Sequence, residues 1–214
     1  AYEISECLVG SEMCIRDWLT ELLRQCAHPG GAAICGAMLW YPDETIQHAG
    51  IVTGLGGYAG HSHKYKKKGG SGYLFRTSTV QDFSGVTGAG LLVKTAVYDE
   101  MHGLDEQFAV AFNDVDFCLR VRDAGYRIAW TPYAELIHYE SKSRGGDEKD
   151  PVKAARFAAE QQRLYTIHGK ENILDDPYYN PNLTRDREDF SESDDLRRLK
   201  EGRVTVRFRG GTLQ

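Results

Sequence analysis

Two short apolar segments limit the fold of this chain more than any other feature. Residues 32–40 and 86–93 are almost wholly apolar or small, and each has the length of a buried β-strand rather than that of a helix. The first is followed by the turn sequence Tyr41-Pro42-Asp43-Glu44, after which residues 45–52 have the composition of a returning strand. The chain therefore needs other elements to cover an apolar sheet.

Helical patterns supply that cover. Helices are predicted over residues 17–27, 113–124 and 150–168, with a short one ending at His102-Gly103, and further strands over residues 126–130 and 134–139. Asp17, Asn113 and Asp150 are suitable N-caps, and Asp116 stands at the third position of a capping box. The mixture predicts an α/β sandwich with a mixed sheet flanked by helices, although the alternating βαβ series that usually opens such a fold is absent.

Three segments carry no regular pattern. Residues 1–16 show neither a helical stripe nor strand alternation and resemble translated adaptor sequence, so we expect a non-native leader with no part in the fold. Residues 53–73 are rich in glycine and lysine and predict a mobile loop that buries little. The polar tail, residues 171–214, is expected to wrap over the domain at 17–170 or to stay partly disordered.

Composition excludes several classes of protein. The chain of 214 residues is 41% hydrophobic and 27% charged, which suits one globular domain. Its net charge of -5 provides no field for a polyanion, so we expect no nucleic-acid partner. The five cysteines lack CxxC spacing, as in a cytoplasmic protein with reduced thiols. No apolar run approaches ~18 residues, so the sequence predicts no transmembrane helix. Action at the inner face of a membrane stays open.

The segment Asn113-Asp114-Val115-Asp116 carries the densest chemical signal. Two acids at positions i and i+2 of a helix start face different ways, so one can point into a cleft while the other caps the helix. The alternative is that both acids only stabilise the helix dipole. Spacing alone leaves both interpretations open.

These residues, with Arg120 and Gly125-Tyr126-Arg127-Ile128, resemble the acidic motif of glycosyltransferase family 2. Other segments match the same family in order: Asp17-Trp18-Leu19, Tyr41-Pro42-Asp43, Ile46-Gln47-His48-Ala49-Gly50, Thr87-Gly88-Ala89, Gly103-Leu104-Asp105-Glu106, Trp130-Thr131-Pro132 and His138-Tyr139-Glu140-Ser141. The resemblance covers residues 17–191. Within the family, the chain is most similar to the rhamnosyltransferase-like enzymes of cell-surface polysaccharide synthesis.

The resemblance implies a fold and an activity. It implies the acceptor-side, C-terminal half of a GT-A sandwich, with the N-terminal nucleotide-binding half missing. The complete enzyme would be an inverting glycosyltransferase that uses Mg²⁺ or Mn²⁺. It would move a sugar from a nucleotide-diphospho-sugar donor to a glycan or lipid-linked acceptor, with peripheral membrane association.

Site residues follow from the resemblance position by position. Asp114 is similar to the catalytic base, which takes the proton of an acceptor hydroxyl as that hydroxyl attacks the anomeric carbon. A single displacement inverts that carbon, so one carboxylate is enough. Asn113 and Asp116 are expected at the substrate. Thr87 and Gly88 are expected to form a backbone surface against the sugars, although they could equally be a tight strand entry.

The expected metal ligand is His138, whose alternative role is a hydrogen-bonded structural histidine. One histidine cannot hold Mg²⁺ or Mn²⁺, and the family's Asp-x-Asp ligands would fall where this chain has residues 11–16. Arg144 is either a solvated loop residue or a contact to the donor diphosphate. His48, His61 and His63 have no carboxylate or cysteine at ligand spacing and, with the adjacent lysines, indicate a flexible loop beside the acceptor cleft.

Two other classes of function stay open. The same cleft could hold a glycan without turnover, as in a carbohydrate-binding module. Alternatively, a half-sandwich would expose sheet edges, which predicts self-association through an edge strand.

Overall fold

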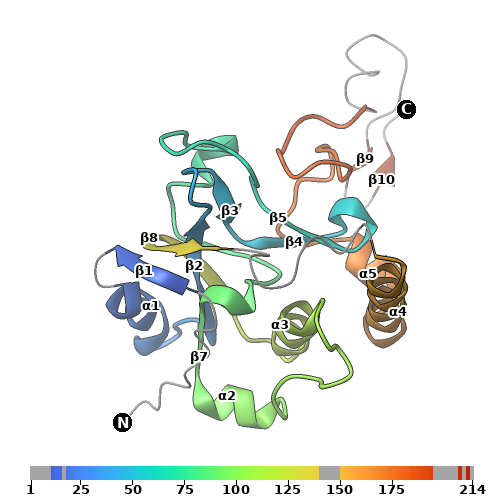
Figure 1. The fold of residues 1–214 in the computed structure, drawn as a ribbon, viewed down its shortest axis with the longest axis horizontal. Coiled ribbons are helices and arrows are strands. Elements are labelled where there is room, and N and C mark those ends of the chain that lie inside the picture. The colour runs from blue at the N-terminus through green and yellow to red at the C-terminus, as the bar shows by residue number, and fades with distance from the viewer. Residues whose placement is uncertain (1–10, 16–17, 140–149, 195–206, 209–210, 213–214) are drawn as a thin grey trace.

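The computed structural model describes residues 11–15, 18–139, 150–194, 207–208 and 211–212 as a mixed α/β structure around one six-stranded sheet (Figure 1). Its strands are β1 (Ser11–Ile15), β2 (Ile34–Trp40), β3 (Ile46–His48), β6 (Gln81–Asp82), β7 (Leu91–Val93) and β8 (Ile128–His138). The order is β1-β8-β2-β3, with β6 also beside β8 and β7 also beside β2. Strands β2 and β8 run parallel and the other pairs antiparallel, so the sheet is mixed, as predicted.

The remaining elements are helices, turns and two hairpins. The helices are α1 (Trp18–Ala27), α2 (Thr95–Glu100), α3 (Asn113–Asp123), α4 (Pro151–His168) and α5 (Lys170–Leu174), and the 3-10 turns are η1 (Leu55–Gly57), η2 (Tyr73–Phe75) and η3 (Gly88–Gly90). Hairpins join β4 (Ile51–Thr53) to β5 (Ala59–His61) and β9 (Arg207–Phe208) to β10 (Gly211–Thr212). No helix in the described ranges is both long and apolar enough to cross a membrane.

Strand β2 has a helix on each of its faces, and all of its residues are buried. Cys35, Ala37 and Leu39 face the core that contains Leu22 and Cys26 of α1. The alternate residues face a second core with α3; they are Ile34, Met38 and Trp40. Side chains alternate between the faces of a strand, so an unbroken apolar run is what a strand covered on both faces requires.

Three of the five cysteines have described side chains. Cys26, Cys35 and Cys118 are buried in these cores as free thiols.

Strand β8 is one element where the sequence predicted two. Its pairing with β2 jumps from Ala37 opposite Thr131 to Met38 opposite Glu135. Pro132 lies in that irregularity, where its missing N–H interrupts no ladder hydrogen bond. The proline therefore marks a bulge rather than the end of the strand.

Residues 86–93 contain less strand than predicted. Only β7 pairs with β2, and the residues before it form η3. The Thr87 side chain accepts a hydrogen bond from Ala89 N and so caps this turn. Apolar content predicted burial correctly here but could not separate a buried turn from a buried strand.

The prediction that residues 53–73 bury little was wrong. Ser62 and His63 are 0% and 2% exposed. Thr53 N donates to Asp176 Oδ2 (2.7 Å) and His61 N to Glu188 Oε1 (2.8 Å), so the C-terminal tail covers this segment. Residues 53–73 and the C-terminal tail are both polar in sequence, and each covers the other. The sequence pattern of either segment alone does not show this burial.

The tail itself takes part in the core in the range that the structure describes. Tyr179, Leu183 and Phe190 are at most 6% exposed and pack against the core on the α3 side. Residues 171–194 therefore wrap over the domain, one of the two outcomes expected from the sequence.

Residues 11–15 also differ from expectation. They form β1, an edge strand antiparallel to β8 in which Ser11 is opposite His138 and Cys14 opposite Leu136. Edge pairing uses backbone groups, so it requires no side-chain alternation. Residues 1–10, 16 and 17 lie outside the described ranges, including Asp17, the predicted cap of α1.

Asp116 joins three parts of the chain. Its side chain is 1% exposed, with Oδ2 2.9 Å from Arg120 Nε and Oδ1 2.8 Å from His168 Nε2. Arg120 also donates to the carbonyl oxygens of Met101 and Gly103. Both carboxylate oxygens have partners inside the protein. We therefore assign Asp116 a structural role in place of the predicted contact to substrate.

We predict that Asp116→Asn lowers the free energy of unfolding by about 3 kcal/mol, because it leaves a cation without its buried partner. Chemical denaturation of the purified chain measures the change. The matched control is Asp123→Asn on the same helix, whose side chain is 59% exposed, with an expected change below about 0.5 kcal/mol. Equal losses in the two variants would contradict the assignment.

Candidate functional site

Two residues predicted for the site meet in the structure. Gly88 N donates to Asp114 Oδ2 at 2.9 Å, although the two residues are 26 positions apart. The second oxygen, Oδ1, accepts from Val115 N at 2.9 Å. Asp114 is half-buried in the first turn of α3. The carboxylate is thus held by two backbone N–H groups in a residue that is only partly buried.

The start of α3 is fixed by the residue before it. Phe112 has a left-handed backbone (φ 64°) and is 7% exposed. Its ring lies 5.5 Å from that of Tyr58 and 5.1 Å from that of Phe157, measured between centroids. A bulky residue with this φ is strained, so the aromatic packing must hold it there.

Asn113 is the first residue of α3 and not, as had been predicted, its N-cap. Its Oδ1 accepts a hydrogen bond from Asp114 N at 2.7 Å. Asn113 therefore adds to the hydrogen bonds around the predicted base, and it is half-buried beside it.

The turn that carries Gly88 is packed against the sheet. A Cβ added to Gly36 in β2 would lie 2.5 Å from the side chain of Val86, and one added to Gly90 would lie 2.9 Å from Leu39 Cδ2. Glycine is therefore needed at both positions for η3 to approach the strands. The Gly88 donor is positioned by this contact.

A buried histidine supports the same turn. His48 is 0% exposed, and its Nε2 is 3.4 Å from Thr87 N and 3.3 Å from Gly50 N. Two N–H donors require Nε2 to be unprotonated, so the ring hydrogen is on Nδ1 and points to His61 Nδ1, 3.2 Å away. Burial, then the nearby rings of His61 and His138, hold the pKa of His48 well below its usual value.

His48 is thus a supporting residue that the sequence did not identify. His48 lies in a segment that matches the family, but together with His61 and His63 it was expected in a flexible loop beside the acceptor cleft. The available signal was its position directly before Ala49-Gly50, where β3 ends.

His138 lies half-buried at the end of β8, near enough to affect the pKa of His48. Across the described ranges, no group of three or more His, Cys, Asp or Glu side chains could hold a metal ion. The described residues therefore do not make up the predicted metal site. Arg144 lies outside the described residues.

Stability is predicted to fall as the pH drops below about 6.5, because buried histidines stay neutral in the folded state while those of the unfolded chain become protonated. Burial, then Lys66 and Arg76, lowers the pKa of His63 from 6.5 to about 4. Its Nε2 accepts from Tyr73 N at 3.0 Å. Each such histidine contributes up to about 1.4 kcal/mol per pH unit.

Denaturation curves between pH 7 and pH 5 measure this loss. His63→Gln keeps a side-chain acceptor for Tyr73 N but cannot take up a proton, so it should reduce the slope of stability against pH. A stability that stays level over this range, or an unchanged slope in the variant, would contradict the role of the buried histidines.

Comparison with known proteins gives a set of partial matches. No family model matches the chain. It is 46% identical over 180 residues to the uncharacterized protein y4gI of Sinorhizobium fredii, covering 84% of this chain and 20% of that protein. It is 34% identical over 168 residues to the O-antigen biosynthesis protein RfbC of Myxococcus xanthus, covering 78% of this chain and 13% of that protein.

A shorter match is to the N-acetylglucosaminyl-diphospho-decaprenol L-rhamnosyltransferase of Mycobacterium tuberculosis. It is 31% identical over 80 residues, which cover 37% of this chain and 24% of that enzyme. The chain thus spans a fifth or less of the first two relatives.

Proposed function

We propose that this chain is part of an inverting glycosyltransferase of family 2, with a GT-A fold, in which Asp114 is the catalytic base. The observation that carries the proposal is the half-buried Asp114 carboxylate, oriented at the start of α3 by the Gly88 and Val115 N–H groups. The mixed sheet with helices on both faces is compatible with such a fold.

The carboxylate has unused capacity for a reaction. A carboxylate has about four acceptor positions, and the backbone occupies one on each oxygen of Asp114. A sugar hydroxyl can therefore donate to a remaining position without displacing either backbone bond. The two N–H groups fix the direction from which that hydroxyl must approach.

The proposed step transfers one proton and exchanges one bond. The acceptor hydroxyl oxygen forms a bond to the anomeric carbon of the donor, and its proton passes to Asp114. The bond from that carbon to the diphosphate oxygen breaks, and its electron pair leaves with the nucleotide diphosphate. Attack from the face opposite the leaving group inverts the anomeric carbon.

The names of the relatives support the class of substrate. One is an O-antigen biosynthesis protein and another an L-rhamnosyltransferase that acts on a diphospho-lipid. We therefore propose a nucleotide-diphospho-sugar donor and a glycan or lipid-linked acceptor in cell-surface polysaccharide synthesis. Reaction at the cytoplasmic face of a membrane fits such an acceptor.

The metal remains a proposal for the complete protein. Mg²⁺ or Mn²⁺ would neutralise the leaving diphosphate, and His138 is the residue that we assign to it. The described residues do not complete a ligand set around this imidazole, so the proton transfer above is derived without the ion.

Asp114→Asn in the natural full-length protein is predicted to reduce sugar transfer by about 10²–10⁴-fold, because the amide cannot take a proton. Release of nucleotide diphosphate and formation of glycosylated acceptor are both measured. The matched control Asp123→Asn, at the other end of α3, should keep the transfer rate. Transfer by Asp114→Asn at the rate of the unchanged protein would refute Asp114 as the base.

A further inference from the structure

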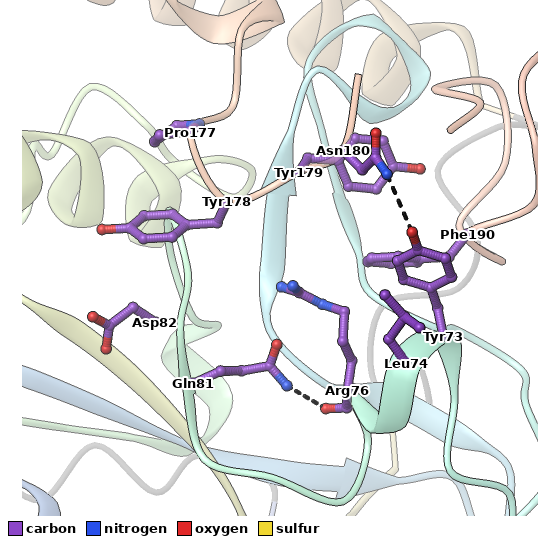
Figure 2. A pocket seen from close by; sticks show the side chains of 10 residues that line it. All are labelled: Tyr73, Leu74, Arg76, Gln81, Asp82, Pro177, Tyr178, Tyr179, Asn180 and Phe190. Carbon is purple, nitrogen blue, oxygen red and sulfur yellow. Dashed lines mark hydrogen bonds between the residues drawn. The ribbon is translucent and has the colours of Figure 1, made fainter. Parts of the chain in front are cut away.

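A pocket of about 630 Å³ lies between the segment that contains η2 and the C-terminal tail (Figure 2). Four aromatic side chains line it together with two apolar and four polar or charged residues; the aromatic members are Tyr73, Tyr178, Tyr179 and Phe190. The volume is that of a site for a small molecule. No lining residue belongs to the candidate site around Asp114.

Arg76 provides the charge in this pocket. Its guanidinium carbon lies 4.9 Å from the ring centroid of Phe83 and 5.6 Å from that of Phe190. In the view of Figure 2, the guanidinium extends between Tyr178 on one side and Tyr73, Tyr179 and Phe190 on the other. Nε and Nη2 are buried and have no hydrogen-bond partner among the residues that the structure describes.

The nearby carboxylates are engaged elsewhere. Asp176 accepts from Thr53 N and Tyr178 N, each at 2.7 Å. Asp82 receives two hydrogen bonds from Arg127, at 3.0 and 3.1 Å. None of the ion pairs between described residues includes Arg76. Burial lowers the pKa of Arg76, and the charge of Asp176 raises it. Asp176 thus compensates the guanidinium in part, and an anion in the pocket would add a second compensating charge.

We propose that this pocket binds an anionic saccharide, a sugar ring bearing a carboxylate or a phosphate. The planar guanidinium suits either anion. The aromatic walls offer flat apolar faces with hydroxyl groups at their edges, which suits a ring with one apolar face and several hydroxyls. Asn180 Nδ2 donates to the Tyr73 hydroxyl at 3.1 Å and so holds one wall in place.

The pocket is separate from the proposed reaction centre. Asp82 and its partner Arg127 place it near the chain that follows the C-terminal end of α3, whereas Asp114 lies in the first turn of that helix. Eleven residues of helix span about 16 Å. The inference is therefore an additional glycan site, which does not depend on Asp114 being a base.

Calorimetric titration of the full chain tests this site with four probes: glucuronic acid, glucose 6-phosphate, glucose and inorganic phosphate. We expect at least one of the two sugar anions to bind, and glucose and inorganic phosphate each to bind at least about tenfold more weakly. Comparison of the two sugar anions identifies the preferred anionic group.

Variants locate the binding. Arg76→Gln should weaken the bound sugar anion at least about tenfold, and Arg76→Lys should weaken it too, since it keeps the charge but loses the planar fork. Tyr178→Ala, in one wall, is a second test if Arg76 variants do not fold. The matched control is Arg24→Gln, with a side chain 71% exposed on α1, which should bind normally, as should Asp114→Asn.

Some results would overturn the proposal. If no probe binds, the pocket is not a site for a sugar anion. If inorganic phosphate binds as tightly as the sugar anions, the aromatic walls do not recognise a ring. Unchanged binding in folded Arg76→Gln, or in Tyr178→Ala, would place the ligand elsewhere.

Discussion

The contact between Val86 and β2 is the constraint on which the candidate site depends. At Gly36 there is no room for a Cβ atom against Val86, which is 0% exposed. The backbone N and O of Val86 lie 3.5 and 3.6 Å from Cys118 Sγ of α3. The segment leading into η3 is thus fixed to the sheet and to the helix at once. This explains how Gly88 N is aimed at Asp114.

Buried polar groups complete that arrangement from two sides. His48 accepts from Thr87 N below the turn, and Asp116 ties the first turn of α3 to His168 of α4. Asp114 and Asp116 are two positions apart, and Asp116 is fully buried while Asp114 is only partly buried. The helix start thus separates a structural carboxylate from one that is available for chemistry.

Sequence patterns predicted the covered strand β2 from its unbroken apolar run and the helix α3 from its amphipathic pattern, although the predicted cap Asn113 is not the N-cap of that helix. They also placed Asp114 and Gly88 in one site, through a family resemblance rather than through spacing. The burial of His63 and Phe190 could not be predicted, because each is covered by a segment far away in the chain. The pocket at Arg76 was missed for the same reason, since its walls come from residues 73–82 and 177–190.

The central claim is that Asp114 receives the proton of an acceptor hydroxyl. A crystal structure of the natural full-length protein with its acceptor glycan tests it most directly. The account predicts an acceptor hydroxyl within about 2.6–3.2 Å of an Asp114 carboxylate oxygen, with the hydrogen bond from Gly88 N intact. An acceptor bound with its reactive hydroxyl against a different side chain, and with no sugar oxygen near Asp114, would contradict the account.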